Sequence, residues 1–226
     1  MPESPTRSSD GRRWRGVEPG DRKAERKLKL IEAGIDLLAA DGPAGVTMRG
    51  VCRRAGLTER YFYESFDNRD GFLVYIFELV VGDAESALQA AVARVPGEPS
   101  EAIALIASTF TDFLVADPRR GEILFVQSVT SELYHHGREL VGRFTDIVAG
   151  LRELFASSGG TLARDDELTR RWDPLALFGG LAFVYQDWLL DPQGVSSEQV
   201  SSYIAYLISI AAGVPLPGAG SDTPQR

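Results

Sequence analysis

Apolar residues recur every three or four positions along most of the chain, which is the spacing of one face of an α-helix. Sustained alternation of apolar and polar residues, the pattern of a half-buried strand, does not occur. Turn-forming pairs such as Asp41-Gly42 and Asp117-Pro118 separate the periodic stretches. The pattern predicts an all-α protein of about nine helices.

Two of the first three predicted helices are short and closely spaced. The first covers about 21–40, the second follows Thr47 and ends at Gly56, and the third follows Thr58. A threonine hydroxyl caps a helix because it accepts a hydrogen bond from a free backbone N–H. Two short helices joined by a tight glycine turn are typical of a helix-turn-helix, whose second helix can enter the major groove of DNA.

A larger helical part follows these three helices. Six more helices are predicted, at about 69–95, 100–116, 119–129, 133–157, 174–190 and 197–212. The chain therefore divides into four parts: a flexible basic arm (1–20), a helix-turn-helix DNA-binding domain (21–68), a helical ligand-binding and dimerisation domain (69–212) and a disordered tail (213–226).

The distribution of charge changes the interpretation of the net charge of −8. Residues 1–75 hold 14 basic and 12 acidic residues, a net charge of +2, whereas the rest hold 10 and 20, a net charge of −10. Residues 7–29 alone hold nine basic and four acidic residues. A locally basic end on an acidic body is typical of a protein that touches DNA with one end only.

Composition also bears on compartment. One cysteine, Cys52, cannot form an internal disulfide, and this favours the reducing cytoplasm. No uninterrupted apolar run reaches the roughly 18 residues of a membrane span, and residues 1–10 lack the apolar core of a signal peptide. We therefore expect a cytoplasmic protein with no membrane partner.

Catalytic and metal-binding patterns are absent from the sequence. It contains no glycine-rich phosphate loop, no nucleophile elbow and no paired histidines at i, i+4. His135 and His136 are adjacent, so on a helix they point about 100° apart and are poorly placed to share a metal. Cys52 fits a buried structural role better than redox sensing. We predict no enzyme activity, no cofactor and no metal.

The outer surface of the helix-turn-helix carries the predicted DNA contacts. Arg60 can bond bidentately to guanine, Glu59 can accept from a cytosine amine, and Tyr61 can touch a thymine methyl or a phosphate. The residues predicted to contact the backbone are Thr47, Arg49, Thr58, Tyr63 and Arg69. Whether the arm also follows the minor groove, through Arg12, Arg13 and Arg15, stays open.

These residues stand within a longer pattern. Its parts are Ile31-Glu32-Ala33-Gly34-Ile35-Asp36-Leu37-Leu38, Asp41-Gly42, Thr47, Ala55-Gly56-Leu57-Thr58, Phe62-Tyr63-Glu64-Ser65-Phe66 and Asn68-Arg69. With this pattern, Leu30–Phe77 resembles the N-terminal domain of TetR-type regulators. Gly50 and Cys52 depart from the residues common in that family. Neither departure removes a DNA-facing group, although Gly50 should weaken its helix by about 1 kcal/mol relative to alanine.

The resemblance implies an all-helical homodimer with an apolar ligand pocket in its C-terminal domain. Aromatic residues beside polar ones suggest the lining of that pocket, and the candidates are Phe110, Phe113, Phe125, Phe144, Phe183 and Gln186. The resemblance also implies that the last two helices form the dimer interface. Their broad apolar faces give Leu177, Leu181, Val184, Trp188, Val200, Ile204, Leu207, Ile208 and Ala211 as candidates.

The function expected from these observations is that of a ligand-responsive, DNA-binding transcriptional regulator. Most relatives of this type are repressors, so we expect a repressor released from a palindromic operator by a small apolar or amphipathic molecule. The alternative is an all-helical small-molecule-binding protein or enzyme with a degenerate DNA-binding head. No residue distinguishes a repressor from an activator.

Overall fold

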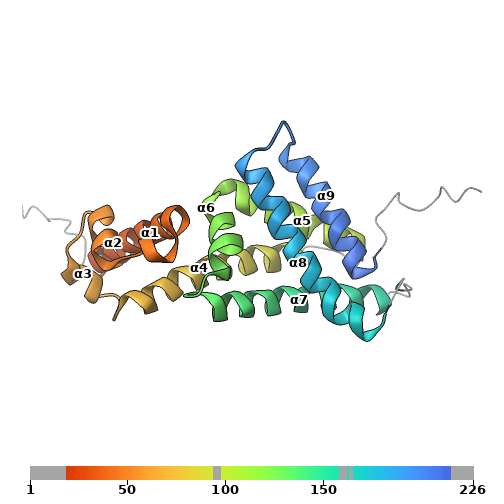
Figure 1. The fold of residues 1–226 in the computed structure, drawn as a ribbon, viewed down its shortest axis with the longest axis horizontal. Helices are drawn as coiled ribbons and strands as arrows, with labels where there is room; N and C mark the ends of the chain where they lie inside the picture. The colour runs from red at the N-terminus through yellow and green to blue at the C-terminus, as the bar shows by residue number, and fades with distance from the viewer. Residues whose placement is uncertain (1–18, 94–97, 158–161, 163–164, 215–226) are drawn as a thin grey trace, which may run out of the picture.

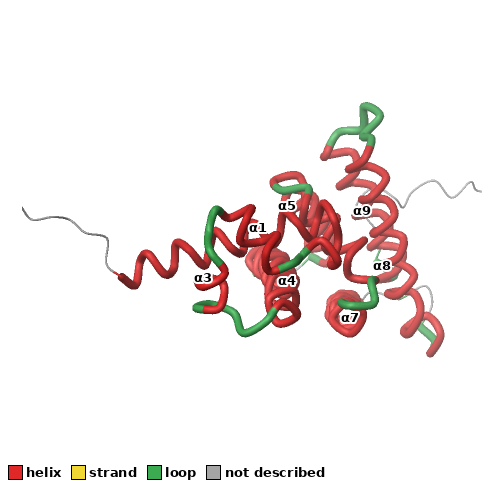
Figure 2. Tube along the Cα trace, turned by 60° about the vertical axis from the view of Figure 1, so that its left-hand side comes forward, coloured by secondary structure: helices red, strands yellow, loops and turns green. Residues whose placement is uncertain are grey.

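A computed structural model describes residues 19–93, 98–157, 162 and 165–214. Throughout these residues the chain forms helices and connecting turns, with no strand (Figure 1, Figure 2). The predicted all-α class is therefore confirmed. Residues 1–18 of the arm, with Arg12, Arg13 and Arg15, and residues 215–226 of the tail lie outside the described residues.

The N-terminal head consists of three helices, α1 (Pro19–Gly45), α2 (Met48–Ala55) and α3 (Glu59–Tyr63). Gly42 interrupts the helical path of α1 with a φ of 67° and a ψ of −173°. Gly56 ends α2 in the left-handed conformation, with a φ of 66°, which a residue with a Cβ adopts only at a cost. This turn sets α3 against α1 and α2.

An aromatic core holds the head together. The ring of Phe62 lies 5.6 Å from that of Phe66 and 5.2 Å from that of Phe72, measured between centroids. Leu30 and Leu38 of α1 are fully buried beside these rings. Leu28, which shares their helical periodicity, is instead 65% exposed, because it faces an open groove between α1, α4 and α6.

Helix α4 (Arg69–Val92) joins the head to the body without interruption. Asn68 caps it by accepting a hydrogen bond from the backbone N–H of Gly71 at 2.8 Å. Its first turns pack under the head, with Phe72 and Ile76 close to Gly34 of α1. Its later turns lie within the body, where they contact α5 and α7, and α7 lies below them in Figure 1.

The body contains the remaining helical segments. They are α5 (Pro99–Ala116), α6 (Arg119–Gly121), a π-helical turn η1 (Glu122–Val126), a 3-10 turn η2 (Gln127–Val129), α7 (Tyr134–Ser157), α8 (Glu167–Leu190) and α9 (Ser197–Ala212). The sequence predicted one α-helix over 119–129, where the structure has three short segments of different pitch.

Helix α8 begins earlier than the pattern predicted. The helix was expected to begin at Pro174, yet it begins at Glu167, and Pro174 lies inside it and is buried. The reason is a stronger start signal upstream. The Asp166 side chain accepts from the N–H of Thr169 at 2.9 Å, and the Thr169 hydroxyl caps in return, which forms a complete capping box.

Helix α5 is long and apolar enough to cross a membrane by length and composition alone. In this structure it is a core helix, since it packs against α4 and α9 and buries Ile103 and Leu114 completely. Such a helix meets the same composition test as a membrane span, so its apolar character is explained by the fold.

Candidate DNA interface and effector cavity

The start of α2 is built around Thr47. Its hydroxyl accepts a hydrogen bond from the backbone N–H of Gly50 at 3.0 Å, so it caps the helix as the sequence suggested. Gly50 is buried, and a Cβ built on it would lie 2.8 Å from the Thr47 hydroxyl oxygen. The glycine therefore leaves room for this cap, which offsets part of the helix weakening expected from its low propensity.

Two exposed arginines dominate the outer surface of α2 and α3. The side chains of Arg49 and Arg60 are 87% and 84% exposed. Arg49 pairs with Glu59 at 3.3 Å and Arg60 pairs with Glu64 at 3.2 Å. Exposed pairs of this kind contribute little to stability. Both guanidinium groups can therefore exchange these partners for phosphate or base edges.

Thr58 and Tyr63 also lie on this outer surface. Thr58 is the N-cap residue of α3, but its hydroxyl makes no capping hydrogen bond, contrary to the prediction, and Tyr63 is 57% exposed. Their hydroxyl groups suit contacts to phosphate. Tyr61 is less accessible, because the guanidinium of Arg26 lies 4.3 Å from the centre of its ring.

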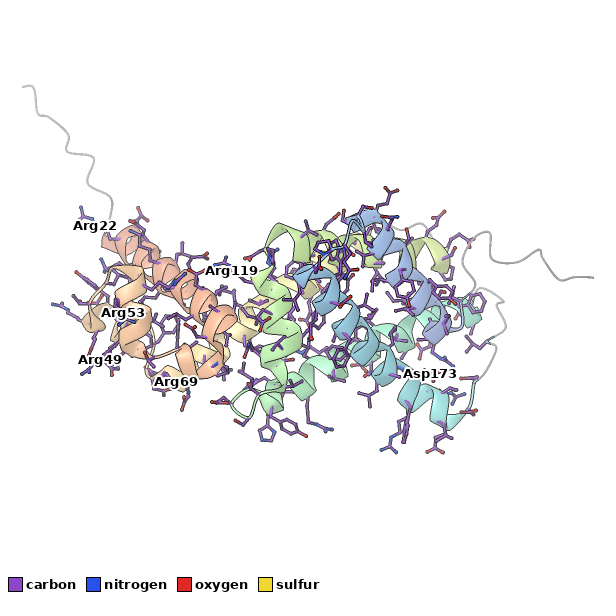
Figure 3. All side chains as sticks on the ribbon, turned by 45° about the horizontal axis from the view of Figure 1, so that its top comes forward. Arg22, Arg49, Arg53, Arg69, Arg119 and Asp173 are labelled. Atoms are coloured by element: carbon purple, nitrogen blue, oxygen red, sulfur yellow. The ribbon has the colours of Figure 1, made fainter. Side chains whose placement is uncertain are left out.

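Arg69 occupies a different environment from the one predicted. Its guanidinium donates to the backbone carbonyls of Val46, at 2.9 Å, and of Pro43. These bonds fasten the start of α4 to the turn between α1 and α2. Arg69 therefore positions the head in this structure rather than presenting a free group to a phosphate (Figure 3).

Arg53 is a basic residue that our sequence prediction missed. It follows Arg49 by one helical turn on α2, and both are exposed. Figure 3 shows both at the end of the head farthest from the body. The i, i+4 spacing of two arginines was the available signal.

The body contains an apolar cavity of about 90 Å³ among α4, α5, η1, α7, α8 and α9. A wider groove of about 660 Å³ adjoins it, and the two share Glu85, Leu88, Ile106, Arg143 and Ile147 in their linings. The groove falls within the usual size range of small-molecule sites. Together they offer a deep apolar end and an open end with charged groups.

The aromatic residues predicted to line a pocket divide into two groups. Phe110, Phe125 and Phe144 line the cavity. Phe113, Phe183 and Gln186 do not line it. Phe113 is buried against the guanidinium of Arg120, and Phe183 is 75% exposed on the outer side of α8.

The charged groups at the cavity were not foreseen. Arg143 of α7 donates to Glu78 at 2.9 Å and to Glu85 at 3.3 Å, both on α4, and these bonds raise the pKa of its guanidinium. The hydroxyl of Tyr185 on α8 forms a hydrogen bond with the Thr111 hydroxyl at 2.8 Å, and burial raises the pKa of its phenol. Its hydrogen bond is therefore made within the core.

The residues predicted to form a dimer interface face inward. Leu177, Leu181, Val200, Ile204, Ile208 and Ala211 are buried within the subunit, and Val184, Trp188 and Leu207 are half-buried against its core. The periodicity identified an apolar face on each helix, but that face packs on α5 and the cavity. For the six buried residues this assignment was wrong, because both helices carry a second apolar face.

The second face of each helix carries exposed apolar side chains, and α8 and α9 lie side by side in both views (Figure 1, Figure 2). We call it the outer apolar face. Its residues are Leu168, Trp172, Leu175, Phe183 and Leu190 of α8 with Tyr203, Tyr206 and Ile210 of α9. Each of these side chains is at least half exposed.

One arginine connects the head to the body. Arg119 at the start of α6 bonds to Glu32 at 2.7 Å and to Asp36, both on α1, and to Asp117 at 2.7 Å. Figure 3 shows it between the two parts. Its bond to Asp117 holds the pKa of that carboxyl below its usual value.

Comparisons with known proteins agree with this geometry. Residues 30–76 match the model of the family described as bacterial regulatory proteins, tetR family. The HTH-type transcriptional regulator AcrR of Shigella flexneri is 21% identical, over 82% of this chain and 89% of its own length. The matches are to transcription regulators rather than enzymes.

Solved structures share the fold. The fatty acid degradation regulator FadR of Bacillus halodurans aligns with a TM-score of 0.69 and 16% identity, over 85% of this chain and 96% of its own. FadR of Bacillus subtilis, solved in complex with stearoyl-CoA, aligns with a TM-score of 0.67 and 18% identity, over 84% and 100%. These likenesses bear out a helix-turn-helix domain followed by a larger helical domain.

Proposed function

We propose that this chain, a transcription regulator with a tetR-family DNA-binding domain, is a ligand-responsive repressor that a small amphipathic molecule releases from a palindromic operator. One observation carries the proposal. Helix α4 supports the head with its first turns and lines the cavity with Val81, Ala84 and Leu88. A molecule that shifts α4 from within the cavity therefore shifts the head, which is the physical requirement for coupling the two sites.

The shape of the site supports an effector with an apolar chain and a polar head. The inner cavity is apolar except for Glu85 and Arg143, and these two groups line the wider groove as well. The apolar tail of such an effector would displace no polar contact inside the cavity, while its polar group could form hydrogen bonds at the groove. FadR of Bacillus subtilis, which shares this fold, is a regulator bound to stearoyl-CoA, a molecule of this general build.

The outer apolar face supports a homodimer. Many large apolar side chains exposed on two neighbouring helices usually mark a protein contact, and an isologous contact between two copies covers the same face on both. The last two helices thus remain our proposed dimer interface, with the opposite face to the one first assigned. Two heads on such a dimer could read the two halves of a palindrome.

The proposal also includes a compartment and a set of DNA contacts. A regulator of bacterial genes acts in the cytoplasm, where the DNA is. Arg60 and Glu59 read bases, while Arg49, Thr58 and Tyr63 contact phosphates, joined by Arg53.

The test begins with selection of bound duplexes from genomic fragments, followed by titration of an amphiphile library against the complex by fluorescence anisotropy. An effector must bind the DNA-free protein more tightly than the DNA-bound protein, which calorimetry with and without saturating operator measures directly. Ala84→Trp fills the inner cavity and should abolish release, whereas Ala90→Trp, on the exposed side of the same helix, should leave it intact. Equal responses of these two variants would contradict the proposal.

A further inference from the structure

We propose that Glu78, His136 and Glu139 form a binding site for a divalent transition-metal ion of the zinc type, which joins α4 to α7. The Nδ1 atom of His136 lies 3.3 Å from Glu78 Oε1 and 3.8 Å from Glu139 Oε2. One ligand atom from each of the three side chains lies within 4.8 Å of the others.

The spacing of these atoms suits a small cation. Zinc binds nitrogen and carboxylate oxygen at about 2.0–2.2 Å in a tetrahedron, so neighbouring ligand atoms lie roughly 3.3–3.5 Å apart. The contact between His136 and Glu78 already has this length. The contact to Glu139 exceeds it by a few tenths of an ångström, and Glu139 is an exposed side chain that can move.

Surrounding groups hold two of the three ligands in place. Arg143 donates to Oε2 of Glu78 at 2.9 Å, which leaves Oε1 directed at His136. The ring of Phe77 contacts the imidazole edge to face, with centroids 6.4 Å apart. Outer hydrogen bonds to a ligating carboxylate are a regular part of metal sites, because they orient the ligand.

The donor set favours one class of metal. One imidazole and two carboxylates suit zinc, nickel or copper ions better than magnesium or calcium, which prefer oxygen alone. His136 and Glu78 are each about 30% exposed, so water can complete the coordination. The site was not expected from the sequence, because Glu78 lies on another helix, 58 residues before His136. The neighbouring His135 takes no part in it.

A metal here would act on the regulation proposed above, and this consequence rests on that proposed function. The site fastens α4 to α7 beside Arg143, which also lines the effector cavity. A bound ion would stabilise the arrangement of α4 seen here. It would therefore change the affinity of the head for DNA, and DNA would change the affinity for metal by the same factor.

The test uses the full chain after removal of metal by a chelator. Zinc is titrated in competition with a chromophoric indicator, and cobalt is then substituted so that its visible spectrum reports the coordination number. We expect one zinc ion per chain. His136→Ala should weaken binding at least about tenfold, the lower end of the effect seen when merely supporting groups are removed. His135→Ala removes a neighbouring exposed imidazole and should bind zinc as the parent does.

Circular dichroism confirms that each variant is folded, and Glu139→Gln provides an exposed second substitution that should also weaken zinc binding. Equal zinc affinity of the parent and His136→Ala, or no stoichiometric zinc in the parent, would overturn the metal site. Gel shifts of the metal-free protein on selected duplexes test the proposed function separately, since the DNA binding proposed for the head does not require zinc.

Discussion

Two exposed surfaces of this chain differ sharply in chemistry. The outer surface of α2 and α3 is charged and carries surface ion pairs such as Arg49–Glu59. The outer apolar face of α8 and α9 presents aromatic and aliphatic side chains, with Phe183 75% exposed. The first surface is well hydrated without a partner, and its basic groups suit a partner that carries phosphates. Exposure of the second surface to water is unfavourable, and covering it with another apolar surface stabilises the assembly by about 25 cal/mol per Å² of apolar area buried.

The largest expected effect is on the free energy of unfolding, and it distinguishes the buried face of α9 from its exposed face. Ile204→Asp places an unpaired charge where the side chain is 1% exposed. We expect a loss of about 3–5 kcal/mol in the free energy of unfolding, measured by urea denaturation. Ser202→Asp, an exposed position on the same helix, should change it by less than about 0.5 kcal/mol. A folded, stable Ile204→Asp subunit would show that this face is not the inner one.

Next in size is the effect on assembly. Phe183→Asp leaves the core untouched and charges the outer apolar face, so the subunit should stay folded while the dimer dissociates. A loss of at least about 2 kcal/mol in association free energy is typical of a central aromatic residue. Sedimentation over a range of concentrations measures it, with Phe183→Leu as the apolar control. Unchanged association of Phe183→Asp would place the interface elsewhere.

The DNA-facing surface should respond to substitution in two distinguishable ways. Arg60→Ala should cost about 1–3 kcal/mol against one base pair and relax the preference there. Arg49→Ala should weaken binding to all duplexes alike and lower the salt dependence by about one counterion. Gel shifts on single-base operator variants at several salt concentrations compare the two. If both variants gave the same profile, the division into base and phosphate contacts would fail.

The smallest effect concerns Arg119, which joins the charged head to the body. Its hydrogen bond lowers the pKa of Asp117 from 3.8, so this pairing stabilises the folded protein above that pH and is lost as the pH falls through the lowered pKa. Arg119→Met should therefore cost up to about 1 kcal/mol at pH 7. Denaturation at pH 7 and pH 3 should show this difference shrinking in acid, and a constant difference would exclude the ion pairs as its cause.

Much of the head was predictable because most of its determinants are local. The Thr47 cap, the Gly56 turn and the buried rings of Phe62 and Phe66 follow from positions a few residues apart. The bonds by which Arg69 joins α4 to the head were missed, because their acceptors, the carbonyls of Pro43 and Val46, lie over 20 residues away and carry no side-chain signal.

The body was predictable only as a set of helices. A period of 3.6 shows that a helix has an apolar face, but α8 and α9 each have two, and only packing against α5 decides which one is inside. The charged groups of the cavity were missed for a related reason. Glu85 and Arg143 have the spacing of solvent-facing residues, and their pairing depends on how α4 meets α7.

The length of α4 determines how far a movement at the cavity displaces the head. At 1.5 Å per residue, its 24 residues span about 36 Å, so a tilt of roughly 5° at the cavity end displaces the other end by about 3 Å. The same rigidity makes the helix intolerant of changes in length. One residue inserted between Phe77 and Val81 would advance the head by about 1.5 Å and turn it by about 100° about the helix axis. Evolution can thus retune the cavity by substitution, while the number of residues between the cavity and the head is fixed by geometry.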